Sequence, residues 1–252
     1  MTTEEFSTEF DVLARSYMTR YQFGSGVDSD GPNFDEYEKS VFLTEAQKQL
    51  VTSLYTGKNP YRESFEFTEE TRRYLESLVR TKVYTTEEAS DDSSLLSKAL
   101  SVNSVFFSLP KDLAFITLEQ VVFDDESLGC LNGKTATVQP VTHDQYGKLR
   151  KNPFRGSSKN KVLRIDTGEG YVELISDYKI GSYTLKYLSK PEPIILTELE
   201  NLTIDGFSEV TDCKLNPMVH SMILDMAVRM ALEHSSIIRN DNAQRQNARG
   251  NV

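Results

Sequence analysis

The histidines, cysteines and serines of this chain are the residues that could supply a nucleophile, a general base or a metal ligand. His143, His220 and His234 have no second metal ligand three or four residues away. Ser221 adjoins His220, but neighbouring side chains on a helix point about 100° apart and cannot form a catalytic pair. The spacing therefore predicts neither a hydrolase triad nor a metal site, and we expect each histidine to be a surface or packing residue.

The remaining motifs point the same way. Cys130 and Cys213 lack CxxC spacing, so we expect two small buried side chains in a reducing compartment. Adjacent carboxylates such as Glu69-Glu70 are common in a chain with 38 acidic residues and mark helix starts or solvated faces. Gly168-Glu169-Gly170 is typical of a hairpin turn, and there is no Walker A motif. We expect a protein that is not an enzyme and needs no cofactor.

The composition of the chain limits which classes of partner it can bind. The chain has 252 residues, a net charge of −10 and a mean hydropathy of −0.44. This charge argues against general binding of nucleic acid, although an acidic wall suits a channel through which DNA slides. No run reaches the roughly 20 apolar residues of a membrane helix, and the acidic N-terminus does not resemble an export signal.

Three helices are expected in the first hundred residues. The first begins at the capping box Thr2/Glu5 and carries the stripe Phe6, Phe10, Leu13 and Tyr17. The second begins at Asp35, or restarts at Thr44 and Gln47, and ends at Gly57. The third has Thr68 as its N-cap and the stripe Tyr74, Leu75, Leu78 and Val79. Segments 24–33 and 85–94 have the composition of loops.

The pattern changes to β near residue 102. Short β-branched and aromatic runs are typical of strands, and they lie at 105–107, 115–118, 121–123, 135–141, 162–166, 171–175 and 183–188. The sequence returns to helix after Asn216-Pro217, and beyond Ser235 it becomes polar. The expected fold is α+β: a helical bundle of three N-terminal helices and a C-terminal helix, with an inserted, mainly antiparallel β-domain. We expect the bundle at 1–100 and 205–235, the β-domain at 101–204 and a flexible tail at 236–252.

Two features stand out as contact surfaces. Seven cations with no acid between them occupy one stretch, namely Lys148, Arg150, Lys151, Arg155, Lys159, Lys161 and Arg164. They predict either a solvated loop or a contact with an anionic partner, such as the acidic face of a neighbouring subunit. Met218, Met222, Met226 and Met230 recur every four residues, which suits either a bundle core or an adaptable interface, and Met222 and Met226 are candidates for the latter.

Four blocks in register resemble structural proteins of crAss-like and related Bacteroidetes phages. They are FSTEFDVL with FDEYEKSVFLTEAQKQLV (34–51), PVTHDQYGKLRKNPFRG (140–156), YTLKYLSKPEPIIL (183–196) and CKLNPMVHSMILDMAVRMALE (213–233). Together they span nearly the whole chain. The resemblance implies a head-to-tail connector of the virion, similar to the portal adaptors of short-tailed phages.

Such adaptors form a twelve-fold ring under the portal and grip it with a C-terminal extension. The resemblance therefore implies self-assembly, contacts with the portal and with other ring or tail proteins, and passage of genomic DNA through the lumen without specific binding. It implies location in the virion neck, with the host cytoplasm as the site of assembly. In the tail, Arg239, Arg245 and Arg249 are the candidate portal contacts.

Several alternatives remain open. Within the particle, the chain could be another of the stacked rings, a tail hub or an ejected cargo protein. Outside this class, a small phage enzyme would require a catalytic constellation that the sequence does not show. A cytoplasmic binding module would be absent from purified virions.

Overall fold

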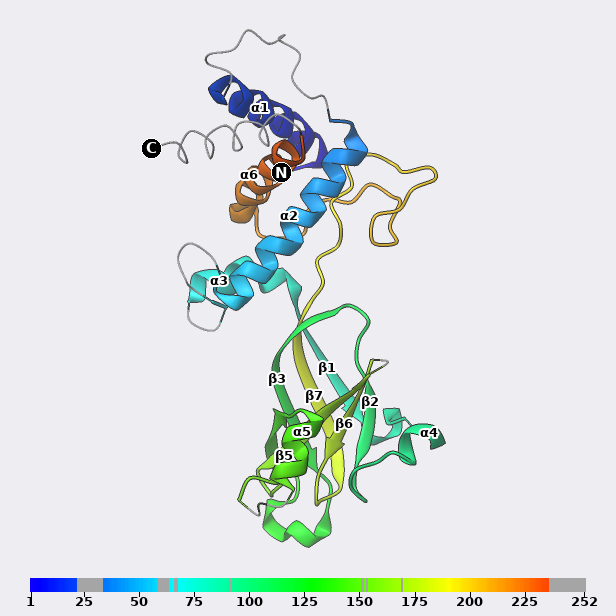
Figure 1. Cartoon of the computed structure of the whole chain (residues 1–252). Helices are drawn as coiled ribbons and strands as arrows, with labels where there is room; N and C mark the ends of the chain where they lie inside the picture. Colours follow the sequence, from blue (N-terminus) through cyan, green and yellow to red (C-terminus); the bar gives the residue numbers. More distant parts are fainter. Residues whose placement is uncertain are drawn as a thin grey trace, which may run out of the picture. The chain divides into compact units, whose positions relative to one another are not determined.

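The computed structural model describes residues 1–21, 34–58, 64–65, 68–90, 92–150, 152, 154–168 and 170–235. The chain divides into two compact units (Figure 1). The helical unit comprises Met1–Leu78 and Pro191–Val252, and the sheet unit comprises Val79–Lys190. Helices together with a mixed seven-stranded sheet make the fold α+β, as the sequence predicted.

Three helices pack on one another in the helical unit, namely α1 (Thr3–Tyr21), α2 (Glu36–Thr56) and α6 (His220–His234). The predicted capping box opens α1, because the amide of Glu5 donates to the Thr2 hydroxyl and the amide of Thr2 donates to the Glu5 carboxylate. Phe6 and Phe10 of the expected stripe are fully buried. A short 3₁₀ turn, η4 (Pro217–Val219), leads into α6 and is capped by Asn216, as expected.

Helix α2 is continuous. The amide of Glu38 donates to Asp35 Oδ1 at 2.7 Å, which completes a capping box at the first turn. Gly57 ends the helix with a φ of 72°, a left-handed conformation that glycine adopts without strain. The alternative of a restart at Thr44 is wrong, because Thr44 is buried in the middle of the helix and hydrogen-bonds to another segment.

The prediction of a third long helix is mostly wrong. Helix α3 (Glu69–Tyr74) is only six residues long and gives way to the 3₁₀ turn η1 (Glu76–Leu78). Val79, the last residue of the expected stripe, begins strand β1 (Val79–Thr85). This segment is rich in valine and threonine, and it pairs along its whole length with residues 182–188 of the last strand. The sheet therefore begins well before residue 101.

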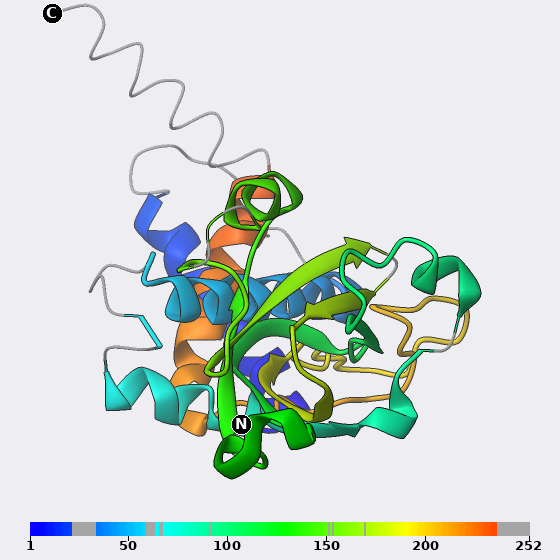
Figure 2. The ribbon, with the colours of Figure 1, turned by 90° about the horizontal axis from the view of Figure 1, so that it is seen from below.

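The other strands are β2 (Val105–Ser108), β3 (Leu113–Phe123), β4 (Thr135–Pro140), β5 (Lys161–Gly168), β6 (Tyr171–Ile175) and β7 (Ile180–Ser189). The strand order is β1-β7-β3-β4-β5-β6-β2. Neighbours in it are antiparallel except β4 and β5, so the sheet is mixed but mainly antiparallel. Figure 2 shows how strongly it curls.

Most strands lie where their residue types placed them. The two runs expected at 115–118 and 121–123 form the single strand β3, which accommodates register shifts against β7. Strands β5 and β6 form the predicted hairpin, with Gly168 and Gly170 at positive φ. Strand β4 ends at Pro140 and connects to its parallel neighbour β5 through helix α5 (His143–Leu149).

The core of the sheet unit is aromatic at its centre. Tyr84, Phe107 and Tyr183 are all buried, and the ring centroids of each pair lie 5.3 to 5.5 Å apart. Short surface elements cover the ends of the sheet, namely η2 (Thr86–Glu88), α4 (Ser93–Leu96) and η3 (Glu126–Leu131). Among the described residues, no helix has the length and apolar character needed to cross a membrane.

Candidate assembly surfaces

The histidines occupy surface and packing positions. His143 is exposed at the start of α5, and His234 ends α6 with its ring centroid 5.8 Å from that of Phe42. His220 is buried and lies 3.0 Å, through Nε2, from the carbonyl oxygen of Leu215. Within the described ranges, no three His, Cys, Asp or Glu side chains are grouped to hold a metal ion.

The burial of His220 predicts a pH-dependent stability. Burial lowers the pKa of its imidazole below the usual range, because a charged ring would lack solvation. The neutral ring therefore stabilises the fold fully above the unfolded-state pKa, about 6.5, and this contribution is lost as the pH falls through the lower folded-state value. Urea unfolding of the full chain should show stability declining below about pH 6.5. His220→Gln, which retains a donor for Leu215, should lose that part of the decline, and equal slopes in both proteins would contradict the assignment.

The two cysteines differ in their exposure to solvent. Cys213 is half-buried beside the amide of Gln47, at 3.8 Å, and burial raises the pKa of its thiol. The expectation of burial is wrong for Cys130, which is exposed. It lies in η3, a surface turn in which only Leu128 is buried.

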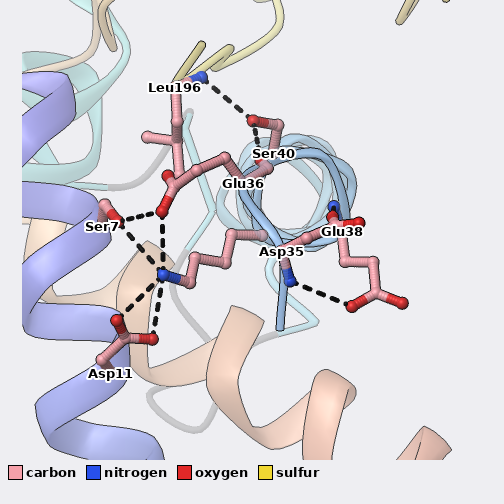
Figure 3. Close-up of polar contacts among 8 residues, drawn as sticks. Ser7, Asp11, Asp35, Glu36, Glu38, Ser40 and Leu196 are labelled. Carbon is pink, nitrogen blue, oxygen red and sulfur yellow. Dashed lines mark hydrogen bonds and ion pairs between the residues drawn. The ribbon is translucent and has the colours of Figure 1, made fainter. Parts of the chain in front are cut away.

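A buried cation joins α1 to α2 in the helical unit. The ammonium of Lys39 donates to Asp11 and Glu36 at 2.9 and 3.0 Å and to the Ser7 hydroxyl at 3.1 Å, while Ser7 donates to Glu36 at 2.7 Å. Figure 3 shows these side chains converging between the two helices. Burial opposes the charged ammonium, but the hydrogen bonds and attraction of Asp11 and Glu36 outweigh it and raise the pKa of Lys39. We call Ser7, Asp11, Glu36 and Lys39 the Lys39 cluster.

A neighbouring face of α2 holds the segment that follows β7. The Ser40 hydroxyl accepts from the amide of Leu196 at 3.0 Å, as Figure 3 shows. One turn later the Thr44 hydroxyl accepts from the amide of Ile194 at 3.1 Å. Tyr37 packs against the buried cluster of Ile195, Leu199 and Ile204. Residues 35–40 therefore cap α2, join it to α1 and anchor the chain at Leu196.

Residues 195–212 form a loop beside the N-terminal half of α2, which we call the acidic loop. Its base is closed by backbone hydrogen bonds between Ile195 and Thr211, and its tip is a tight turn in which Asp205 and Gly206 have φ of 53° and 87°. Asp205 pairs with Lys48 at 2.7 Å. The other acidic side chains of the loop are exposed and have no ion-pair partner in the described part of the chain, namely Glu198, Glu200, Glu209 and Asp212.

Apolar side chains accompany these charges on the acidic loop. Leu202, Phe207 and Val210 are 50%, 45% and 48% exposed, although the loop also buries Leu199 and Ile204. Exposed apolar groups rimmed by charge are typical of a surface that meets another protein. No motif pointed to this loop, and the only sequence signal was the run of six acids without a cation between Pro191 and Asp212.

The basic stretch of the sequence is exposed over most of its length. We call residues 148–161 the basic segment. Lys148, Arg150, Arg155 and Lys159 are exposed and form no ion pair with any described residue, and Lys161 is half-buried and donates to the Arg155 carbonyl. Lys151 lies outside the described residues. Phe154, within this segment, is 94% exposed.

Arg164 differs from the other cations, because its side chain lies inside the sheet unit. It is buried, and Nη1 donates to Glu119 Oε2 at 2.8 Å. Tyr183 donates to the other oxygen of Glu119, and burial together with this carboxylate raises the pKa of the phenol. The structure thus separates Arg164 from the exposed basic surface with which the sequence grouped it, since β5 turns this side chain inward.

A hollow of about 730 Å³ adjoins the basic segment within the sheet unit. Its apolar lining includes Leu100, Val102 and Tyr146, with Leu163 and Ile175 of β5 and β6 below. Arg150 lies on its wall, and Val102 is fully exposed at its edge. The Tyr146 hydroxyl donates to the Leu100 carbonyl at 3.3 Å, which ties α5 to the 99–102 segment across the hollow.

The methionine row of η4 and α6 is exposed at its first two members and half-buried at its last two. The buried face of the helix consists of His220, Ile223, Leu224, Ala227, Val228, Ala231 and Leu232. Met218 and Met222 are 70% and 37% exposed, and Met226 is half-buried. The bundle-core alternative is therefore wrong for Met218 and Met222, whereas Met226 and Met230 are half-buried beside the packed face. Arg239, Arg245 and Arg249 lie outside the described residues.

Charge is distributed unequally between the two units. The helical unit contains 13 basic and 24 acidic residues, a net charge of −11, whereas the sheet unit contains 15 and 14, a net charge of +1. The acidic excess of the chain therefore lies in the helical unit, and the sheet unit is nearly neutral. The chain presents one strongly acidic unit and one unit with an exposed basic segment.

Comparison with known proteins identifies the family. Residues 1–245 match the family described as phage tail ring protein 3/4. The chain is 44% identical over 234 residues to ring protein 3 of Bacteroides phage crAss001, covering 92% of this chain and 95% of the relative. It is 31% identical over 241 residues to ring protein 4/5 of the same phage, covering 92% of each. The chain therefore belongs to the phage tail ring protein 3/4 family and is a structural ring protein of crAss-like phages.

Proposed function

We propose that the chain forms a closed, twelve-fold ring in the neck of the particle, where it joins the portal to the tail and continues the DNA channel. Membership of the ring protein family over nearly the whole chain is the observation that supports this proposal most strongly. The exposed basic segment, with the exposed Met222 and the half-buried Met226, supplies surfaces suited to contacts between subunits.

The charge of the helical unit suits a channel wall. Twelve copies with a net charge of −10 would carry about −120, and like charge keeps DNA phosphates from adhering. The lumen would then be lined by the helical unit, whose net charge is −11. DNA passes such a wall without a specific binding site. Assembly takes place in the host cytoplasm, and the finished ring belongs to the virion.

The tail at 236–252 gives this function a direct test. Its three arginines are proposed to contact the portal, so a chain truncated after Ser235 should remain folded but should no longer join the particle. Electron microscopy of particles made with the full chain should show a twelve-fold ring between portal and tail. Particles made with the truncated chain should lack that ring or lose the tail.

The control is the purified truncated chain, whose thermal unfolding should match that of the full chain. A ring in its normal place built from truncated chains would contradict the role of the tail. A full chain located in the tail hub, or packaged with the DNA as an ejected protein, would contradict the neck position.

A further inference from the structure

We propose that the acidic loop of one copy docks on the basic segment and the adjoining hollow of a second copy. This inference rests on the proposed ring and deepens it by naming the two surfaces that join neighbouring subunits. The contact is head-to-tail, because the loop belongs to the helical unit and the hollow belongs to the sheet unit. A head-to-tail contact repeated by rotation is what generates a ring.

Charge complementarity is the first argument. Glu198, Glu200, Glu209 and Asp212 are exposed on the loop, and no described cation pairs with them. Arg150 lies on the wall of the hollow, and Lys148, Arg155 and Lys159 are exposed in the adjoining basic segment. No described acid pairs with these four cations, and Asp177, the one acid in the lining, accepts from the Ser157 hydroxyl at 2.7 Å. Opposite charges left exposed on two surfaces of one chain are satisfied when copies associate, and such pairing sets the register of the contact.

Apolar complementarity is the second argument. Phe207 and Leu202 project from the loop although the loop has its own buried cluster, so they are not needed to fold it. The lining of the hollow is partly apolar, with Leu100, Tyr146 and Leu163 among its residues, and offers these side chains to an aromatic ring. An aromatic anchor in a pocket with a charged rim is the usual composition of a strong protein contact.

Rigidity is the third argument. The loop is fixed to α2 through Leu196, Ile194 and the Lys48–Asp205 pair. The hollow is fixed by the capping box of α5 at Thr142 and by the Tyr146–Leu100 hydrogen bond. Two preformed surfaces lose little conformational freedom on binding, which favours association.

A carbodiimide that couples carboxylates directly to amines tests the contact in intact particles. We expect cross-linked dimers of the chain in which peptides carrying Glu198 or Glu209 are joined to peptides carrying Lys148 or Lys159. Rings visible by microscopy with the loop linked only to another protein, or not linked at all, would overturn this inference and leave the proposed function standing. Particles without a ring of this chain would overturn both.

Exchanging the charges gives a second test that a structural defect cannot imitate. The loop variant is Glu198→Lys with Glu209→Lys, and the hollow variant is Arg150→Glu with Lys159→Glu. Each should reduce the number of copies per particle at least about tenfold, because like charges meet at every contact. Host cells that make both variants should restore normal copy number, since each loop then finds a complementary hollow on the other variant in alternating order.

The matched control reverses Glu9 and Glu45, which are exposed on α1 and α2 outside the loop, and it should leave the copy number unchanged. Thermal unfolding of the purified variants should match that of the unmodified chain. If the reversed side chains unfold the protein, Glu198→Gln with Glu209→Gln replaces the loop variant and should still lower the copy number. Failure of the mixed variants to restore assembly, with both folded, would overturn the proposal.

Discussion

Glu119→Leu is expected to destabilise the full chain by about 3–5 kcal/mol, because it leaves the buried guanidinium of Arg164 without its principal partner. Among the described residues, the one other carboxylate within 4 Å of this guanidinium is that of Asp166, at 3.4 Å and largely exposed. The Tyr183 hydroxyl also loses its acceptor inside the sheet unit. Urea unfolding followed by near-ultraviolet circular dichroism measures this loss, because the aromatic core surrounds Tyr183.

Replacing Glu119, Arg164 and Tyr183 together distinguishes the effect of an unpaired charge from the effect of altered packing. The triple variant Glu119→Leu, Arg164→Met, Tyr183→Phe has no buried charge or hydroxyl left unpaired, so it should regain more than half of the lost stability. Glu119→Gln keeps one acceptor oxygen for the Arg164 guanidinium, and its amide nitrogen can donate to the Tyr183 hydroxyl, so it should cost less than Glu119→Leu. A triple variant no more stable than Glu119→Leu would show that the side chains pack poorly without the network, and that the unpaired charge is not the cause of the loss.

Local signals in the sequence predicted the elements that depend on local contacts. The capping boxes at Thr2 and Asp35, the left-handed Gly57 and the β5–β6 hairpin are set by residues within a few positions of one another. Strand β1 was missed because Val79 continues the apolar spacing of α3, and its strand character comes from pairing with β7 about a hundred residues later. A partner so distant leaves no local trace.

The candidate surfaces likewise differ in how far local sequence predicts them. The basic segment and the methionine row could be named from spacing, but their exposure could not. Arg164 belongs to the same charge run as Lys161, yet Arg164 is buried and Lys161 is not, because β5 is buried on both faces from Val162 to Ile165 and Lys161 is its first residue. The acidic loop has no periodic pattern, and only its contacts with α2 show that it is an ordered surface.

The second large loss of stability is expected when Lys39 is replaced. Lys39→Met removes the buried ammonium and leaves the Asp11 and Glu36 carboxylates facing each other without a cation. These carboxylates are 36% and 42% exposed and keep part of their water, so we expect a loss of about 2–3 kcal/mol, below the range for fully buried pairs. Lys48→Met is the matched control on the same helix, since its pair with Asp205 is exposed and should contribute at most about 1 kcal/mol.

The pH dependence identifies the ion pair as the cause. The pKa of Lys39 is raised on folding, so its contribution is complete below the unfolded-state pKa, about 10.4, and is lost as the pH rises through the folded-state value. The stability difference between wild type and Lys39→Met should therefore shrink above about pH 10.4, and a constant difference would point to packing instead. Because Ser40, the next residue, holds Leu196 at the start of the acidic loop, loosening this turn of α2 should also weaken assembly.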